Sequence, residues 1–320
     1  MQIVDFTAAH IEQAARIAKQ NYENERGFVL VLPPIDAVPD LTPYVKNGLG
    51  VAALEGDTLL GFLCAIGPFN NAFGSTDATG VFSPMGANAA ISKNRANVYA
   101  RMYQAAGEKW VRAGASSHAV CLYAHDTETQ GQFFRCGFGL RCIDAIRGTD
   151  GLSSRPPDHY TFSRVASEHA ASVLPLDNML DRSYTDSPFF MFRAGHSTEE
   201  WLAYWQESRP VCLIAKQGSL PVAFILAEAD GENFLMQTPG YRHITGLFCL
   251  PEHRGTGVSR ELLSLLIQTL KADGCSRLGV DYESFNPSGS GFWKKHFTAY
   301  THSVVRRIDE YAAAEARKSL

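Results

Sequence analysis

The apolar and polar positions between residues 244 and 270 predict a strand, a tight turn and an amphipathic helix. Ile244 to Leu250 is a continuous apolar, β-prone run that ends at Pro251. A helical apolar face follows, formed by Leu262, Leu263, Leu265, Leu266 and Leu270. The residues between them, Glu252 to Ser259, form the turn, so its second half opens the helix.

The same kind of reading along the first half of the chain predicts alternating strands and helices. We expect strands or hairpins at residues 2–5, 51–66, near 81, 118–125 and 137–146. Helices are expected at 8–22, 43–47 and 127–135, together with one that ends at residue 113. In the second half we expect strands at 160–165, 211–215, 221–228, 244–250, 277–283 and 303–308. Helices are expected there at 168–181, 198–206, 259–270 and 288–295.

The two halves repeat at a nearly constant offset. Gly218 follows Gly56 by 162 residues, Phe224 follows Phe62 by 162, and Gly274 follows Gly114 by 160. Such a long period predicts duplicated domains rather than a solenoid. We therefore expect an α/β chain with mixed sheets and two tandem copies of one fold, at residues 1–150 and 158–310. The linker between them is Arg155-Pro-Pro-Asp158.

Composition excludes several classes of protein. The chain has 320 residues, 45% of them hydrophobic, and a net charge of −4 without a long run of one sign, so no nucleic-acid or membrane partner is expected. It has neither a membrane-length apolar run nor a secretion signal, which makes the cytoplasm the expected location. The seven cysteines contain no C-x-x-C pair, so no metal site is expected.

The turn before the leucine-rich helix has the properties of an anion site. It comprises Arg254, Gly255, Thr256, Gly257, Val258 and Ser259. The first N–H groups of a helix have no intrahelical partner and lie at the positive end of the macrodipole, so a phosphate can accept several hydrogen bonds there. The glycines let a ligand approach the backbone.

Arg254-x-x-Gly257-x-Ser259, preceded by Leu247-x-Cys249-x-Pro251, resembles the acetyl-CoA pyrophosphate loop of the GNAT superfamily of N-acetyltransferases. The family pattern is Gln/Arg-x-x-Gly-x-Gly/Ala. This chain differs from it at the last position, where Ser259, also a small residue, replaces glycine or alanine. The resemblance implies two GNAT folds and acetyl-CoA as co-substrate. It also implies that Phe248, Cys249 and Leu250 contact the pantothenate arm through their backbone, and that an amide near Leu247 or Phe248 faces the thioester oxygen.

A second family segment, Asn-x-x-Ala-x-x-Phe/Leu-Tyr, is similar to residues 286–293. Asn286 and Phe292 match the pattern, and the resemblance adds both, with Trp293, to the residues that contact the cofactor. The tyrosine that protonates the departing thiolate in many members is Trp293 here, whose N–H is not acidic. Either the thiolate leaves without a dedicated acid, or Tyr282 or Tyr300 substitutes.

The family's usual basic glutamate is replaced by Thr245, which cannot accept a proton. Other members use a carboxylate on the following strand, a position that Asp281 holds here, and Glu283 faces the same side by strand alternation. One of the two carboxylates could have its pKa raised by the other and accept an ammonium proton. Both could equally be solvated acids at a strand end, and His243 and Glu228 are weaker alternatives.

The first copy lacks the loop, because Asn94, Asn97 and Tyr99 fall where Arg254, Gly257 and Ser259 stand in the second. It is expected to resemble a GNAT fold that has lost cofactor binding.

The predicted function is transfer of an acetyl group from acetyl-CoA to the amine of a small molecule by direct attack. The alternatives are a protein that senses CoA or an amine without turnover, and a plain nucleotide-phosphate binder. Phe189, Phe190 and Phe192 predict an apolar wall of the acceptor site. A homodimer is left open.

Overall fold

The computed structural model describes residues 1–72, 78–229, 231 and 233–318, and their contacts divide the chain into two compact units. Unit 1 comprises Met1–Asp144 and Ala299–Leu320, and unit 2 comprises Ala145–Thr298. The last strand of the chain therefore belongs to unit 1, although it follows unit 2 in sequence. The predicted repeat boundaries, 1–150 and 158–310, stay a prediction about how the sequence was duplicated.

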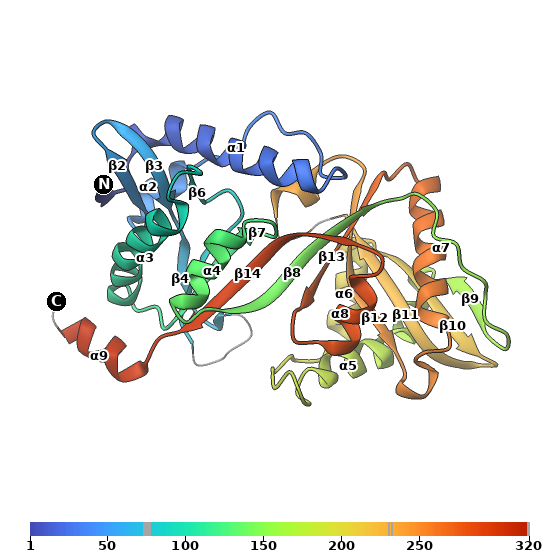
Figure 1. Cartoon of the computed structure of the whole chain (residues 1–320). Coiled ribbons are helices and arrows are strands. Elements are labelled where there is room, and N and C mark those ends of the chain that lie inside the picture. Colours follow the sequence, from blue (N-terminus) through green and yellow to red (C-terminus); the bar gives the residue numbers. More distant parts are fainter. Residues whose placement is uncertain (73–77, 230, 232, 319–320) are drawn as a thin grey trace. The chain divides into compact units, whose positions relative to one another are not determined.

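Unit 1 contains the first elements of the chain and the last two (Figure 1). Its strands are β1 (Gln2–Asp5), β2 (Val51–Glu55), β3 (Thr58–Leu63), β4 (Ile66–Phe69), β5 (Gly80–Ser83), β6 (Asn88–Ala90), β7 (Ser117–Tyr123), the start of β8 (Gly139–Gly148) and β14 (Thr298–Arg307). Its helices are η1 (Ala8–His10), α1 (Ile11–Phe28), α2 (Thr42–Asn47), α3 (Arg95–Arg112), α4 (Thr127–Arg135) and α9 (Glu310–Lys318).

The strands of unit 1 divide between two sets. Strands β1, β2, β3 and β6 form an antiparallel sheet in the order β1-β2-β3-β6. Strands β4, β5, β7 and β14 follow one another in a second, mixed set, in which β5 and β7 are parallel and β14 is antiparallel to β7. Helix α3 packs its apolar side, including the fully buried Trp110 and Met102, onto this framework.

Unit 2 contains the elements between residues 145 and 298. Its strands are the end of β8, β9 (Thr161–Arg164), β10 (Val211–Gln217), β11 (Leu220–Glu228), β12 (Tyr241–Cys249) and β13 (Arg277–Glu283). Its helices are η3 (Ser167–Ser172), α5 (Leu174–Ser183), α6 (Thr198–Ser208), η4 (Phe234–Gln237), η5 (Pro251–His253), α7 (Val258–Ala272) and α8 (Pro287–Trp293).

The sheet of unit 2 runs in the order β13-β12-β11-β10-β9. All its neighbours are antiparallel except β12 and β13, which are parallel and joined by the crossover helix α7. Four of the five leucines predicted to form the apolar side of α7 are fully buried, namely Leu262, Leu263, Leu266 and Leu270, whereas Leu265 lies at the edge of this side and is only partly buried. Helices α5 and α6 form a second cluster against β10, β11 and β12.

Several predicted boundaries were wrong. The first helix continues to Phe28, and β12 begins at Tyr241 rather than at Ile244. Residues 168–181 do not form one helix, because η3 ends at Ser172 and α5 starts with Pro175 in its first turn. The predicted final strand starts at Thr298 and pairs with β7. Strand β6 and helix α9 were not predicted.

None of the helices in the described part of the chain combines the length and the apolar character that crossing a lipid bilayer requires.

Candidate functional site

The centre of the candidate site is the gap that opens between the parallel strands β12 and β13 of unit 2. Their pairing runs from Tyr241 with Arg277 to Ile244 with Val280 and stops there, although both strands continue. On its other edge β12 stays paired with β11 as far as Cys249. The second half of β12 therefore has one backbone edge in the sheet and the other edge facing the gap.

The pairing also tells which amides face this gap. The Leu250 N–H donates to the Val222 carbonyl oxygen on the β11 side, at 2.9 Å. Because backbone groups alternate from one edge of a strand to the other, the Phe248 N–H also points to β11, and the N–H groups of Leu247 and Cys249 point into the gap. Of the two predicted oxyanion donors, the geometry favours Leu247.

A β-bulge separates the paired and unpaired halves of β12. Gly246 opposes Leu226 and Ile244 opposes Ala227, which leaves Thr245 without an opposite residue. The exposed Thr245 side chain donates a hydrogen bond of 2.6 Å to Glu228 Oε1, and the Tyr204 hydroxyl donates to the same oxygen at 2.5 Å. A carboxylate on β11 thus lies beside the position where the family places its glutamate.

The turn after β12 has the predicted character of a helix N-terminus with open amides. Gly255 and Gly257 have φ angles of 79° and 95°, and a Cβ on either would meet no atom within 4 Å. Helix α7 starts at Val258, with Gly257 as its N-cap. Within the described residues, no protein oxygen accepts from the backbone N–H groups of residues 255–260. These donors point to a ligand that accepts several hydrogen bonds.

Arg254 is fixed beside this turn by its own side chain. Its Nε donates to the Cys249 carbonyl oxygen at 3.1 Å, and its guanidinium lies 5.8 Å from the centre of the Phe248 ring. Burial raises the pKa of the Cys249 thiol, and a hydrogen bond with the Ser259 side chain only partly opposes this. Cys249 is therefore a thiol at neutral pH, which disfavours an acyl-cysteine mechanism.

Asp281 lies where β13 leaves β12, and its partner is His243. The His243 Nε2 and Asp281 Oδ1 atoms are 2.8 Å apart; the side chain of His243 is 4% exposed and that of Asp281 39%. Burial on its own would raise the pKa of Asp281, but the hydrogen bond and the charge of His243 bring it below its usual range. Asp281 is thus ionised at neutral pH, so it is not a carboxylate whose pKa is raised by its neighbour. The other carboxylate of the predicted pair, Glu283, is buried.

The second family segment forms α8 and its cap. Asn286 is the N-cap, and its side chain accepts from the Gly289 N–H at 2.8 Å; a Cβ on residue 289 would clash with this side chain. Trp293 is buried and lies edge-to-face against Phe292. Of the two tyrosines proposed as substitutes for the missing acid, Tyr282 is 5% exposed, and Tyr300 is fully buried in unit 1.

The segment between α5 and α6, which was predicted to line the acceptor site, brings together aromatic and charged side chains. Tyr184 stacks under the Arg193 guanidinium, 3.8 Å from the ring centre, and contacts Phe189, which in turn contacts Phe285. Phe190 and Phe192 are 77% and 62% exposed. Burial raises the pKa of the Tyr184 hydroxyl above its usual value, and the charge of Arg193 opposes this rise only in part. The predicted apolar wall therefore also carries polar groups.

The corresponding turn of unit 1 is filled by the protein itself. Arg95 makes an ion pair with Asp126 (2.8 Å, both side chains 12% exposed) and also donates to Asn21 and to the Ala90 carbonyl oxygen. At the start of α3 the Ala96 N–H donates to the Glu128 carboxylate. Groups of the chain therefore occupy the place that an anion would need.

We expect the change Arg95→Ala to destabilise unit 1, because it leaves the mostly buried Asp126 without its cation. The loss should be about 2 kcal/mol, or about 5 °C in melting temperature. Arg16→Ala removes an exposed ion pair with Glu12 and should change the melting temperature very little. Similar melting temperatures for the two variants would argue against this account of the turn.

Part of unit 2 is similar to a known family, and the whole chain is similar in fold to solved structures. Residues 177–297 match the Acetyltransferase (GNAT) family. No curated protein matches the chain.

The chain is similar in structure to a GCN5-related N-acetyltransferase from Sphaerobacter thermophilus (12% identity, 96% of this chain and 95% of that one, TM-score 0.59). It is less similar to a tandem GNAT protein from the clavulanic acid biosynthesis pathway (12%, 96% and 98%, 0.45). A putative acetyltransferase from Salmonella typhimurium, solved with acetyl-CoA, also matches (15%, 48% and 97%, 0.37).

The first of these similarities covers nearly the whole chain and confirms the predicted GNAT architecture. Unit 2 contains the segment that matches the family, including the loop from Arg254 to Ser259. His243 and Glu228 were expected to be weaker candidates than Asp281, and their contacts with Asp281 and Thr245 were not predicted. Both contacts join different strands, so no local pattern announces them.

Proposed function

We propose that unit 2 transfers an acetyl group from acetyl-CoA to the amine of a small molecule by direct attack on the thioester. The observation that supports this most is the row of unengaged amides at residues 255–260, directly after a strand whose free edge faces a gap. The amides would bind the pyrophosphate, and the gap would take the extended pantetheine arm. Of the three residues that the resemblance assigned to that path, Cys249 would face it with its backbone, whereas the N–H groups of Phe248 and Leu250 point to β11. Asn286, Phe292 and Trp293 would stand at the end of the opposite strand.

The residues of the chain fit this ligand in charge and in shape. The open space beside Gly255 and Gly257 allows a phosphate to reach the backbone, and Arg254 adds a positive charge. At the other end of the arm, the Leu247 N–H would donate to the thioester oxygen. As the amine attacks, that oxygen becomes negative, and a fixed donor stabilises it more than the ground state.

Asp281 is the proposed proton acceptor. A carboxylate with a low pKa does not readily deprotonate a free ammonium ion, but it can orient that ion. It can also take a proton from the nitrogen once the C–N bond has formed, because that nitrogen is then far more acidic. His243 would hold the carboxylate in place. Glu283 stays the second candidate, and Glu228, which Thr245 contacts, is a third.

Trp293 holds the position of the family's acidic tyrosine, and of the two candidate substitutes Tyr282 is 5% exposed and Tyr300 is fully buried. We therefore propose that CoA leaves as the thiolate, because a thiolate is a much weaker base, and so a better leaving group, than the anion of the attacking amine. Unit 1, whose turn is filled by Arg95 and Glu128, would act as a scaffold.

The test is release of free thiol from acetyl-CoA in the presence of a panel of small amines. Amine-dependent thiol release would support acetyl transfer. The second candidate function is that of a sensor. It is favoured because Thr245 and Trp293 replace the glutamate and the tyrosine that many members of the family use in catalysis. Binding of acetyl-CoA without thiol release for any amine in the panel would support the sensor.

A further inference from the structure

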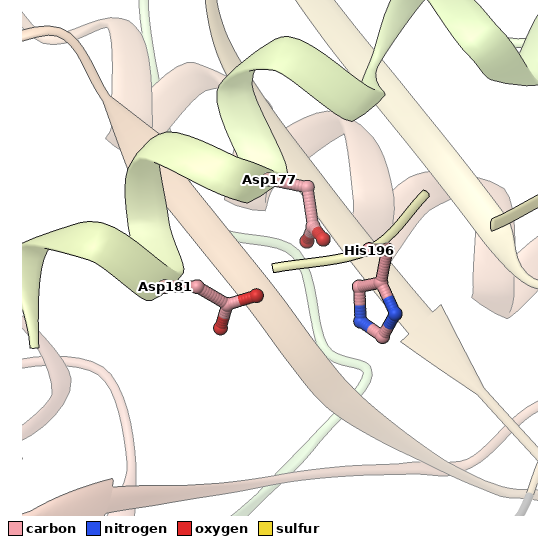
Figure 2. A group of neighbouring side chains, drawn as sticks. All are labelled: Asp177, Asp181 and His196. Atoms are coloured by element: carbon pink, nitrogen blue, oxygen red, sulfur yellow. The ribbon is translucent and has the colours of Figure 1, made fainter. Parts of the chain in front are cut away.

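Three side chains that can bind a metal ion meet on unit 2 although the sequence gives no metal motif. Asp177 and Asp181 are one helical turn apart on α5, and His196 lies in the segment before α6. One ligand atom from each lies within 4.8 Å of the others. Figure 2 shows both carboxylates and the imidazole turned toward a common space.

The backbone of His196 is fixed in this position by a fourth residue. The Asn178 side chain accepts from the His196 N–H at 2.7 Å and donates to the His196 carbonyl oxygen at 3.1 Å. A Cβ on residue 195 would lie 2.5 Å from the Asn178 oxygen, so glycine is needed for this approach. The next residue, Ser197, starts α6 with a capping box. Hydrogen bonds therefore hold the backbone of His196 at the junction between two helices.

The two carboxylates are in an arrangement that costs stability without a cation. Like charges four residues apart on a helix repel each other. In the described part of the chain, neither carboxylate forms a hydrogen bond or a salt bridge. The guanidinium of Arg193 stacks on Tyr184, and its charge acts on the two carboxylates without a direct contact. A dication between the carboxylates would turn this repulsion into attraction.

We propose that Asp177, Asp181 and His196 form a binding site for a divalent transition metal ion, for which Zn²⁺ is the best fit. Two carboxylate oxygens and one imidazole nitrogen are the donors that Zn²⁺ accepts, and three protein ligands leave a position open for water or another ligand. Zn²⁺ needs its ligand atoms about 3.3 Å apart, so rotation of the exposed His196 and of the aspartates has to close the remaining distance. The nitrogen donor disfavours Mg²⁺.

The test is calorimetric titration of the metal-free full chain, without a histidine tag, with Zn²⁺ alone. We expect one Zn²⁺ per chain at this site. Asp177→Asn and His196→Ala should each weaken binding at least tenfold, and Mg²⁺ should not compete. The matched controls Glu199→Gln and His169→Ala change an exposed acid and an exposed histidine of the same unit and should bind like the wild type.

Three results would overturn the proposal: no Zn²⁺ binding, binding that survives both Asp177→Asn and His196→Ala, or a thiolate charge-transfer band in the Co²⁺-loaded protein, which would place the ion on a cysteine. Circular dichroism shows whether the variants fold, and Asp177→Asn removes a repulsion, so folding should not obscure the result. Because the readout is metal binding, it does not depend on whether the protein acetylates an amine.

Discussion

Replacing Asp281 with asparagine is expected to lower the turnover of acetyl transfer about 100-fold, the lower end of what a positioned proton acceptor contributes. Asparagine keeps the size of the side chain and can still contact His243, but it cannot accept the proton from the attacking nitrogen. The affinity for acetyl-CoA should change little, because the loop at residues 254–259 is untouched. The measurement is the rate of thiol release with an amine that the panel identifies.

The pH dependence follows from the lowered pKa of Asp281. The carboxylate stays ionised through the neutral range, so the ratio of wild-type to variant rates should be constant there, and both rates should rise with pH as the acceptor amine loses its proton. Asp273→Asn, an exposed aspartate at the end of α7, is the matched control. If Glu283→Gln or Glu228→Gln abolishes turnover while Asp281→Asn does not, the base is assigned to the wrong carboxylate.

Replacing Gly257 with glutamate is expected to weaken acetyl-CoA binding at least tenfold, or about 1.4 kcal/mol. The new side chain starts from the N-cap of α7, in the space that the pyrophosphate would take, and its negative charge repels the phosphates. The φ angle of 95° adds backbone strain, because residues with a Cβ rarely adopt it.

The change Gly218→Glu separates the strain from the effect on the site. Gly218 also has a positive φ (59°) and open space around its Cα, but it lies in the turn between β10 and β11. Gly218→Glu should therefore bind acetyl-CoA like the wild type. Equal affinity of the folded Gly257→Glu variant and the wild type would contradict the proposed binding site.

The sequence predicted the local parts of the site well, because they depend on neighbouring residues. The helix α7 follows from its leucines, and the open turn follows from two glycines at a strand-to-helix junction. The strands expected at 211–215 and 221–228 are also present, as the paired strands β10 and β11. In each case a few consecutive residues carry the physical reason.

The parts that were not predicted depend on contacts between distant segments. The strand expected to complete the second copy is β14, which pairs with β7. The contact of His243 with Asp281 joins residues 38 positions apart, and the grouping of Asp177 with His196 depends on the course of an irregular segment. Hydrophobic periodicity carries no information about such partners.

The most direct test of the account is calorimetric titration of the chain with acetyl-CoA. We expect one acetyl-CoA per chain, lost in Gly257→Glu, because the turn of unit 2 has open amides and that of unit 1 is filled by Arg95 and Glu128. Absence of binding, or one site that Gly257→Glu leaves unchanged, would contradict the proposed site. Two acetyl-CoA molecules per chain would show that unit 1 binds the cofactor as well.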